Sequence, residues 1–281
     1  MATVPISFPN LGIFLNPPTS FTVLGLTVHW YGVIISVGFL LAVWYGDRRA
    51  KQFGLTEDNI LSMLLFAVPL AIVCARAYYC AFAWEDFRDD PISCLYIWEG
   101  GIAIYGAVIG ALLGGWIYCR LAKVRFAAMT DLGALGLMIG QSVGRWGNFM
   151  NREVYGVETD SFLKMGLGEG ESVKYYHPLF LYESLWNALG FVLLHFYSKR
   201  RKFDGEVFLL YVVWYGLGRG VLEGMRMTQY NLMIPGTSIP FSQVLGFASA
   251  AVAAAVWALV RFSPKRREKK LWVQELAERE S

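Results

Sequence analysis

A short stretch of this sequence gathers polar side chains of a kind that could bind an anion. Residues 144–156 read GRWGNFMNREVYG and directly follow the apolar segment DLGALGLMIGQSV. Their charged and amide residues are Arg145, Asn148, Asn151, Arg152 and Glu153. The planar guanidinium of Arg binds phosphate through two parallel hydrogen bonds. Because ionisable groups beside an apolar segment are costly without a partner, the stretch indicates a binding site.

A second polar stretch is GRGVLEGMR, residues 218–226. Arg219 and Glu223 are four residues apart and share one helix face, and Arg226 lies three residues further along it. One interpretation is an intrahelical ion pair with a structural role. Arg145 weakens that interpretation, because its estimated depth in the bilayer, given below, is similar to that of Arg219. Two arginines beside the single carboxylate of Glu223 would leave one positive charge without a partner. An anionic ligand would neutralise this charge, and in a membrane cavity we expect it to be a phospholipid headgroup.

The stretch HPLFLYESLWN is open to two interpretations. His177 and Pro178 begin a helix, and Tyr182 and Glu183 follow in its first turns. An exposed loop histidine with an interfacial tyrosine explains the pattern as well as a functional pair does.

The stretch WEGGIAIYGAVIGALLGGW, residues 98–116, is rich in glycine. Small residues at every fourth position let two helices approach closely, which accounts for Gly110 and Gly114. Close packing does not account for Glu99 or Tyr105, so Tyr105 is a candidate site residue.

Composition places these stretches in a membrane protein. Hydrophobic residues make up 56% of the 281 residues, and the mean hydropathy is +0.41. Charged residues make up 17%, against about 25% in soluble proteins. A bilayer core of about 30 Å needs about 20 mostly apolar residues per helix. We therefore expect an all-α, polytopic membrane bundle of about seven transmembrane helices. Their expected ranges are 29–46, 59–80, 97–119, 128–148, 178–197, 205–224 and 239–261.

The distribution of Lys and Arg predicts the orientation, because cytoplasmic loops carry the excess of these residues. The first, third and fifth loops and the C-terminal tail hold 17 of the 25. We expect the N-terminus outside and the C-terminus in the cytoplasm. The expected parts are a surface arm over 1–28, a membrane domain over 29–261 with a longer outer segment at about 149–177, and a basic cytoplasmic tail over 262–281.

The helical rise of 1.5 Å per residue estimates how far each buried charge lies across the bilayer. Arg145 is ~21 Å beyond Asp131, and Arg219 is ~22 Å beyond Asp204. Arg76 is ~25 Å beyond Asn59. In the spans that run inward, the polar residues near the outer end are Tyr31, Tyr105 and Glu183. The sequence therefore predicts a polar site in the outer half of the membrane.

Motifs for metal, nucleotide or hydrolytic chemistry are missing from the sequence. It has no HExxH, no phosphate-cradling glycine loop and no local signature of a catalytic serine. None of the four Cys forms a CxxC pair, so we expect them to be packing residues. We expect no cofactor and no metal.

With these residues in view, the chain resembles the bacterial prolipoprotein diacylglyceryl transferase family over essentially its whole length. GRWGNFMNREVYG is similar to the family signature Gly-Arg-x-Gly-Asn-Phe-x-Asn-x-Glu-x-x-Gly. HWYG, WEGG, HP followed by LYE, and RGVLEGMR occur in the family's order. The resemblance implies a multi-pass enzyme of the bacterial plasma membrane. It would move the diacylglyceryl group of phosphatidylglycerol onto the lipobox cysteine thiol of a prolipoprotein, forming a thioether and releasing glycerol phosphate, as the first step of lipoprotein maturation.

The resemblance also implies roles for individual residues. The partners implied for this protein are phosphatidylglycerol, the prolipoprotein signal peptide with its lipobox cysteine and membrane lipids, with no nucleic acid. The implied catalytic residues are Arg145, Arg219, Glu223 and Tyr105. The implied phosphatidylglycerol-binding residues are Arg145, Asn148, Glu153, Gly156, Tyr31 and Arg219.

Tyr105 is a departure from the family, in which many members carry a His as a candidate base. A phenol has an ordinary pKa of about 10, too high for an easy base at neutral pH. We expect Tyr105 to donate a hydrogen bond instead, and the identity of the base stays open.

Two other functions would also place arginines in a membrane protein. A lipid or small-anion transporter is one, although the chain shows no internal repeat or matching pair of broken helices. A non-catalytic scaffold that binds lipid or signal peptides is the other, but it would not need two converging arginines.

Overall fold

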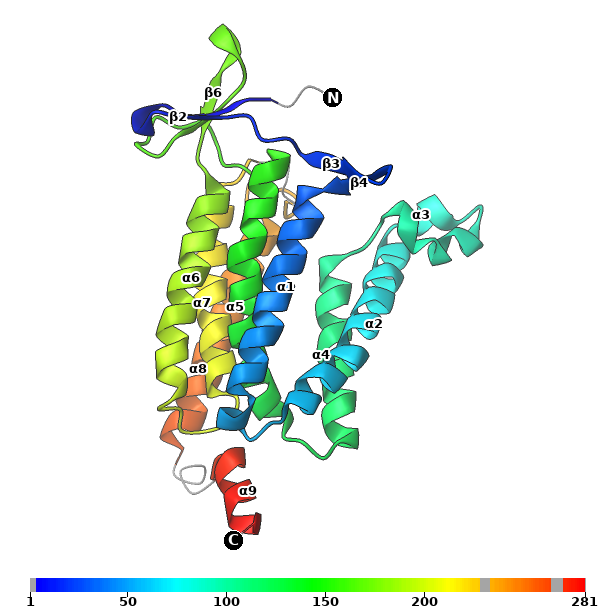
Figure 1. The fold of residues 1–281 in the computed structure, drawn as a ribbon, viewed down its shortest axis with the longest axis vertical. Coiled ribbons are helices and arrows are strands. Elements are labelled where there is room, and N and C mark those ends of the chain that lie inside the picture. The colour runs from blue at the N-terminus through cyan, green and yellow to red at the C-terminus, as the bar shows by residue number, and fades with distance from the viewer. Residues whose placement is uncertain (1–3, 228–232, 264–269, 281) are drawn as a thin grey trace. The chain divides into compact units, whose positions relative to one another are not determined.

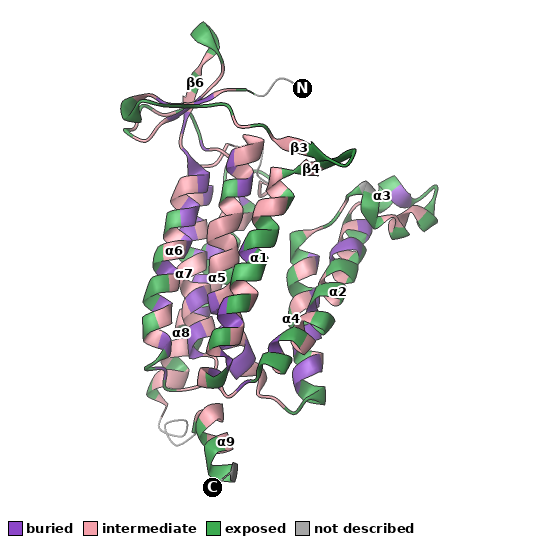
Figure 2. Cartoon of the chain, in the orientation of Figure 1, coloured by how far each residue is buried: buried purple, intermediate pink, exposed green. Residues whose placement is uncertain are grey.

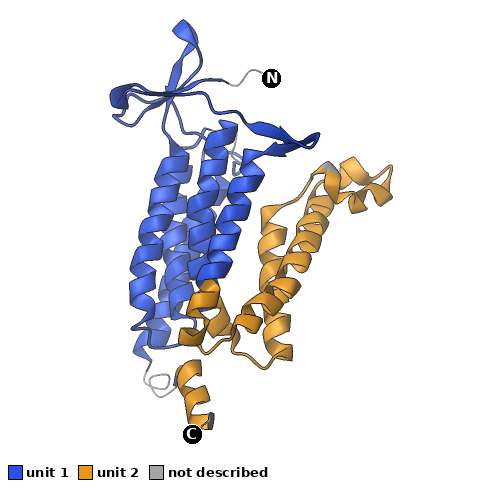
Figure 3. Cartoon of the chain, in the orientation of Figure 1, with its two compact units in different colours: residues 1–45, 131–270 blue, residues 46–130, 271–281 orange. Residues whose placement is uncertain are grey.

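The computed structural model describes residues 4–227, 233–263 and 270–280 (Figure 1). The chain divides into two compact units, shown in Figure 3. Unit 1 comprises residues 1–45 and 131–270, and unit 2 comprises residues 46–130 and 271–281.

Five long helices contribute to unit 1. They are α1 (Trp30–Arg49, up to Tyr45), α5 (Phe126–Asn151, from Asp131), α6 (Leu179–Ser198), α7 (Glu206–Glu223) and α8 (Phe241–Phe262). Small residues let them approach closely. A Cβ on Gly38 of α1 would lie 3.2 Å from Cβ of Val143 on α5, and a Cβ on Gly216 of α7 would lie 2.5 Å from the carbonyl oxygen of Gly246 on α8.

Two tryptophans fix α6 against α7. The rings of Trp186 and Trp214 stack with centroids 4.2 Å apart and an interplanar angle of 17°. Each indole donates to the other residue's carbonyl oxygen, at 3.0 Å from Trp186 and 2.9 Å from Trp214. The pair thereby satisfies both indole N–H groups and holds the two helices in one register.

An antiparallel sheet lies at one end of the unit 1 helices (Figure 1). Its order is β2-β1-β5-β6, and a separate hairpin pairs β3 with β4. Ile6 and Phe8 of β1 pack with Phe149, Met165 and Phe180. The strands are β1 (Ile6–Phe8), β2 (Ile13–Leu15), β3 (Ser20–Val23), β4 (Leu26–His29), β5 (Met165–Leu167) and β6 (Lys174–Tyr176).

The all-α prediction is therefore incomplete, although the chain is mainly helical. Strands of three or four residues are too short to show a recognisable alternation of apolar and polar side chains. The sheet also joins β1 to β5, which lie far apart in the sequence. Residues 4–28, expected as a surface arm, supply β1, β2, β3 and part of β4.

Unit 2 is built on two tightly packed helices, α2 (Glu57–Phe82) and α4 (Ile104–Leu121). A Cβ on Gly106, Gly110 or Gly114 would collide with a backbone carbonyl oxygen of α2. The close-packing prediction for Gly110 and Gly114 is confirmed. The short helices of unit 2 are η2 (Ala50–Phe53), α3 (Trp84–Phe87), η3 (Pro91–Leu95), η4 (Ile97–Glu99) and α9 (Trp272–Glu280), and those near the sheet are η1 (Pro9–Leu11) and η5 (Gly170–Ser172).

The helix α9 packs on the segment that follows α1. Trp272 donates from Nε1 to the carbonyl oxygen of Gly54 at 3.0 Å, and Glu275 pairs with Arg125 at 2.7 Å. The part of the expected C-terminal tail at residues 264–269 lies outside the described residues.

Helix length and composition support a polytopic membrane protein. Among the described residues, six helices are long and apolar enough to cross a bilayer. Large apolar side chains such as Leu65 of α2 (75% exposed) and Leu259 of α8 (73%) lie on their surfaces. Figure 2 shows exposed positions along α2 and α4. Helix α7 is not among the six and carries Glu206, Arg219 and Glu223. The count of seven spans stays a prediction.

Candidate functional site

The centre of the site is a carboxylate on α6 that faces two arginines from other helices. Arg145 of α5 pairs through Nη2 with Oε2 of Glu183, and Arg219 of α7 lies 3.8 Å from the same oxygen through Nη1. Glu183 is only 6% exposed. Three helices therefore converge on one buried carboxylate.

A second carboxylate on α7 extends the cluster. Glu223 pairs through Oε2 with Nη2 of Arg219 at 2.7 Å and through Oε1 with Nη1 of Arg226 at 3.4 Å. Ser242 of α8 donates to Oε1 at 2.7 Å. Glu223 is 2% exposed, so these partners, rather than water, stabilise the negative charge of its carboxylate. The predicted Arg219–Glu223 pair is present.

The cluster carries more positive than negative charge. Arg145, Arg219 and Arg226 face the two carboxylates of Glu183 and Glu223, which leaves one surplus positive charge. The side chains of Arg145 and Arg219 are each 20% exposed. Both arginine side chains are therefore partly accessible, whereas those of Glu183 and Glu223 are only 7% and 2% exposed.

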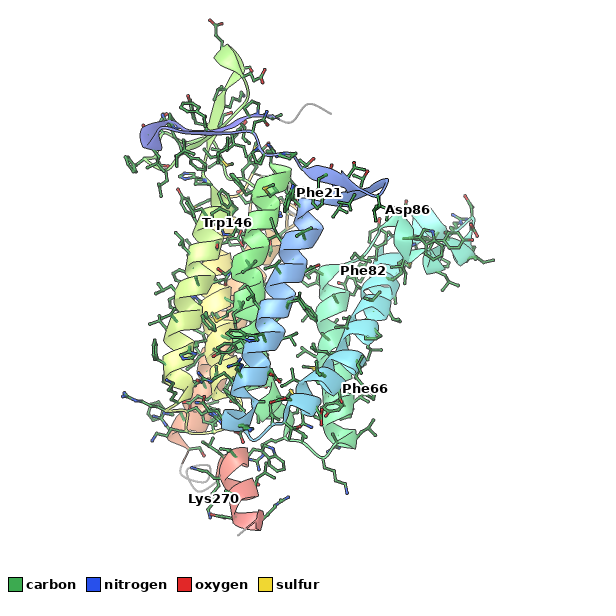
Figure 4. All side chains as sticks on the ribbon, viewed as in Figure 1. Phe21, Phe66, Phe82, Asp86, Trp146 and Lys270 are labelled. Carbon is green, nitrogen blue, oxygen red and sulfur yellow. The ribbon has the colours of Figure 1, made fainter. Side chains whose placement is uncertain are left out.

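Hydrogen bonds between α5 and α6 hold Arg145 and Glu183 in place. The Ser142 and Ser184 hydroxyls each donate to the other residue's carbonyl oxygen, at 2.9 and 2.8 Å. Trp146 donates from Nε1 to Oγ of Ser184 at 3.2 Å. Trp146, labelled in Figure 4, adjoins Arg145 in the chain, and Ser184 adjoins Glu183. The two charged residues thus lie where the helices are firmly joined.

The remaining polar residues of the 144–156 stretch form a chain of hydrogen bonds that begins at Arg145. Its Nη1 donates to Oδ1 of Asn148 at 3.5 Å, and Nδ2 of Asn148 donates to Oε1 of Glu153 at 2.9 Å. Asn151 donates to the same oxygen at 3.4 Å. Glu153 thereby orients Asn148, which orients Arg145.

The backbone after α5 turns sharply to return Glu153 toward the helix end. Arg152 and Val154 have φ of 52° and 57°, in the left-handed region that favours glycine. Arg152 compensates through its guanidinium, which donates to the carbonyl oxygens of Val4, Met150 and Pro17 at 3.0, 2.6 and 2.6 Å. Arg152 therefore organises the turn and the N-terminal segment.

Gly156 lies where two segments leave no room for a side chain. A Cβ there would lie 2.7 Å from Cβ of His177 and 2.8 Å from the carbonyl oxygen of Met225. Its amide donates to the carbonyl oxygen of His177 at 2.9 Å, and it forms a β-bridge with Arg226. Gly156 therefore joins the residues before α6 to the end of α7.

Tyr31 packs directly on the helix that carries Arg145. A Cβ on Gly147 of α5 would lie 2.8 Å from Cδ2 of Tyr31, so the ring lies flush against the backbone. Gly147 directly precedes Asn148 and lies two residues after Arg145. The structure thus brings Arg145, Asn148 and Glu153 together and places Tyr31 against α5 at Gly147.

Comparison with known proteins decides the family. The family described as Prolipoprotein diacylglyceryl transferase matches residues 18–259. This chain belongs to that family. It is similar to the phosphatidylglycerol–prolipoprotein diacylglyceryl transferase of Bacillus licheniformis, with 40% identity over 253 residues that cover 87% of this chain and 93% of the relative. The enzyme of the same name from Enterococcus faecalis is 39% identical over 252 residues, covering 86% and 89%.

Membership of a family of transferases confirms that the chain is an enzyme and confirms the resemblance. Among the described residues, no group of three or more His, Cys, Asp or Glu side chains is arranged to hold a metal ion.

Arg76 does not contribute its guanidinium to the arginine cluster, although its estimated depth in the bilayer is similar to that of Arg145 and Arg219. It lies in unit 2 and donates to the carbonyl oxygens of Ser93, Cys94, Gly100 and Gly101 at 2.7, 2.8, 2.5 and 2.9 Å. The segment before α4 therefore uses this guanidinium to satisfy carbonyl groups of its own backbone.

Tyr105 also lies in unit 2, at the beginning of α4. Its ring centroid is 6.3 Å from that of Tyr78, and the residue is 37% exposed. Its role toward the arginines of unit 1 stays a prediction for this family member.

Sequence reasoning gives no role in the site to Arg226 or Ser242, and it includes Glu183 only as one of several polar residues near the outer ends of the helices. Helical spacing does not say which side chain of another helix Glu183 meets. Arg226 was placed on the face of Arg219 without a role. Ser242 gave no signal, because a serine shortly after Pro240 is typical of an ordinary helix start.

Proposed function

We propose that this enzyme transfers the diacylglyceryl group of phosphatidylglycerol to the lipobox cysteine thiol of a prolipoprotein. A C–S bond forms at the glycerol carbon that carries the phosphate, and the C–O bond to the phosphate breaks. The thiol loses its proton, glycerol phosphate leaves, and the product is a thioether. The observation that carries the proposal is the convergence of Arg145 and Arg219 on Glu183. The printed names of the relatives agree with it.

The surplus positive charge suits this reaction. Two partly exposed guanidiniums bind the phosphate, and the same groups stabilise the second charge that grows on it as the C–O bond breaks. Glu183 and Glu223 hold the guanidiniums in fixed orientations before the substrate arrives. Little reorganisation is then needed as the charge develops. The same field favours the thiolate, the form in which the cysteine attacks.

Tyr105 has a proposed role as hydrogen-bond donor to a phosphate or ester oxygen. The proposed phosphatidylglycerol site around Arg145 includes four further residues. Asn148 and Glu153 orient the Arg145 side chain, and Gly156 and Tyr31 pack against the neighbouring backbone.

The proposed setting is the bacterial plasma membrane, crossed seven times with the N-terminus outside and the C-terminus in the cytoplasm. The alternating excess of Lys and Arg supports this orientation. Counting α7 as a span gives the odd number that the orientation needs. Because its three charged residues are buried or paired, α7 meets the condition under which ionisable groups are tolerated in a bilayer.

A reconstituted transfer assay tests the proposal. The purified protein is incubated in detergent with phosphatidylglycerol and a peptide carrying a lipobox cysteine, and the peptide mass is measured. We expect a mass gain equal to one diacylglyceryl group, together with release of glycerol phosphate. A peptide with serine at the lipobox position is the control. For the protein reconstituted in lipid vesicles, lipid movement across the bilayer without any modified peptide would support a transporter instead.

A further inference from the structure

The two arginines of the site lie on helices that are joined to each other at the opposite end. Asp131 of α5 accepts from the backbone amide of Gly205 through Oδ2 at 2.8 Å and from that of Phe208 through Oδ1 at 2.9 Å. These amides belong to the N-cap and the third residue of α7. Asp131 is fully buried, so this carboxylate is an internal cap supplied by a different helix.

Helix α7 cannot supply this cap itself. Its N-cap residue is Gly205, with φ of 96° and no side-chain hydrogen bond. A side chain at this φ would be strained, so Ser, Thr, Asp or Asn is disfavoured at the position where they usually cap. The beginning of α7 is therefore defined by where Asp131 lies.

The spacing from this joint to the site is the same on both helices. Arg145 is fourteen residues beyond Asp131, and Arg219 is fourteen residues beyond Gly205. At 1.5 Å per residue, each arginine lies ~21 Å from the joint. The two guanidiniums arrive at one oxygen, Oε2 of Glu183.

We propose that Asp131 is a positioning residue that sets the register of α7 against α5, so that Arg145 and Arg219 meet one phosphate at the same height. This inference rests on the proposed function, because it assumes that both arginines bind the phosphate. Asp131 touches no substrate and acts only through the placement of Arg219.

The test compares Asp131→Ala, Asp131→Asn and Asp131→Glu for single-turnover transfer per folded enzyme and for phosphatidylglycerol binding. Asp131→Asn keeps one of the two acceptors in place and turns the other into a donor that faces an amide N–H, so it should lose up to several-fold in rate. Asp131→Ala should lose about tenfold or more in rate, as a lost transition-state contact does. Asp131→Glu keeps the charge but moves the acceptor by one methylene, so it should be slower than Asp131→Asn. Even if the Ala variant does not fold, the comparison of transfer rates between the Asn and Glu variants still tests whether Asp131 is a positioning residue.

Coupling to Arg219 separates positioning from general stability. In an Arg219→Ala background, Asp131→Ala should cause no further loss of rate per folded enzyme. Thr56→Ala is the matched control, because it removes the cap of α2, in unit 2. It should lower the melting temperature without changing that rate.

Two results would overturn the inference. One is a transfer rate that is higher for Asp131→Glu than for Asp131→Asn. The other is an Asp131→Ala change that lowers the transfer rate by the same factor whether or not Arg219 is present. An Arg219→Ala variant as active as the parent would instead contradict the proposed function, whatever Asp131 does.

Discussion

Arg145 and Arg219 share one acceptor, the Oε2 atom of Glu183, although they belong to different helices. A carboxylate shared in this way keeps two positive charges close together without a bound ligand. Under the proposed function, a phosphate would meet guanidinium groups that Glu183 already holds, so the entropy of ordering two long side chains would be lost during folding rather than during binding.

Replacing Arg145 tests the two-pronged phosphate contact. Arg145→Ala should lower the transfer rate by about 10²–10³-fold, the usual loss of one preorganised donor to a developing negative charge. Arg145→Lys should also be poor, because an ammonium is a point charge and cannot form two parallel hydrogen bonds. Initial rates with lipobox peptide measure both variants. Arg88→Lys is the control, since the Arg88 side chain is 70% exposed. Near-normal rates for the Arg145→Lys enzyme would contradict the bidentate contact.

Replacing Glu183 tests the shared acceptor. Glu183→Gln keeps the shape but removes the charge that offsets both arginines. The free energy of unfolding should fall by about 1–3 kcal/mol, because a buried charged hydrogen bond is lost. The transfer rate should fall more than phosphatidylglycerol affinity, because the surplus charge still attracts the lipid while the guanidiniums are no longer aligned. Equal losses in rate and affinity would show that Glu183 does not act through alignment.

The Arg219–Glu223 pair is expected to work as a unit. Arg219→Ala should be the more damaging change, because it removes a phosphate contact and leaves Glu223 with fewer partners. Glu223→Gln should weaken transfer without unfolding the protein, since Ser242 and Arg226 still contact the side chain. The double variant should resemble Arg219→Ala in a single-turnover assay. If the losses of transfer rate in the two single variants add up fully in the double variant, Glu223 has only a structural role. Glu85→Gln, at an exposed pair, is the control.

Tyr105 is expected to donate a hydrogen bond during the reaction. Tyr105→Phe should remove about a few kcal/mol of transition-state stabilisation, comparable with one lost oxyanion donor. Tyr105→His should retain activity, because imidazole can also donate. Steady-state kinetics of the parent and the two variants decide between the roles. Activity of the Tyr105→Phe enzyme equal to that of the parent would make Tyr105 a packing residue of α4.

Gly156 is expected to accept no side chain. Gly156→Ala should nearly abolish transfer, because its Cβ would lie 2.7 Å from His177 and displace the segment that bridges to Arg226. Gly133→Ala is the matched control, because a Cβ there meets nothing within 4 Å. That control should keep its activity and gain slightly in melting temperature, as alanine favours a helix. Normal activity of the Gly156 variant would show that this bridge can shift without cost to the site.

The sequence alone determined the membrane class, the approximate helices and the similar distances of Arg145 and Arg219 along their own helices, because hydropathy and helical rise are local properties. It also predicted the Arg219–Glu223 pair, since residues four apart on one helix must share a face. Only the tertiary structure decided that Glu183 joins both arginines and that Arg76 serves its own loop. Helical spacing fixes a side chain's height and direction on its own helix. Which neighbour it meets depends on how helices rotate and pack against each other, through contacts such as Trp186 on Trp214 and Asp131 on Gly205.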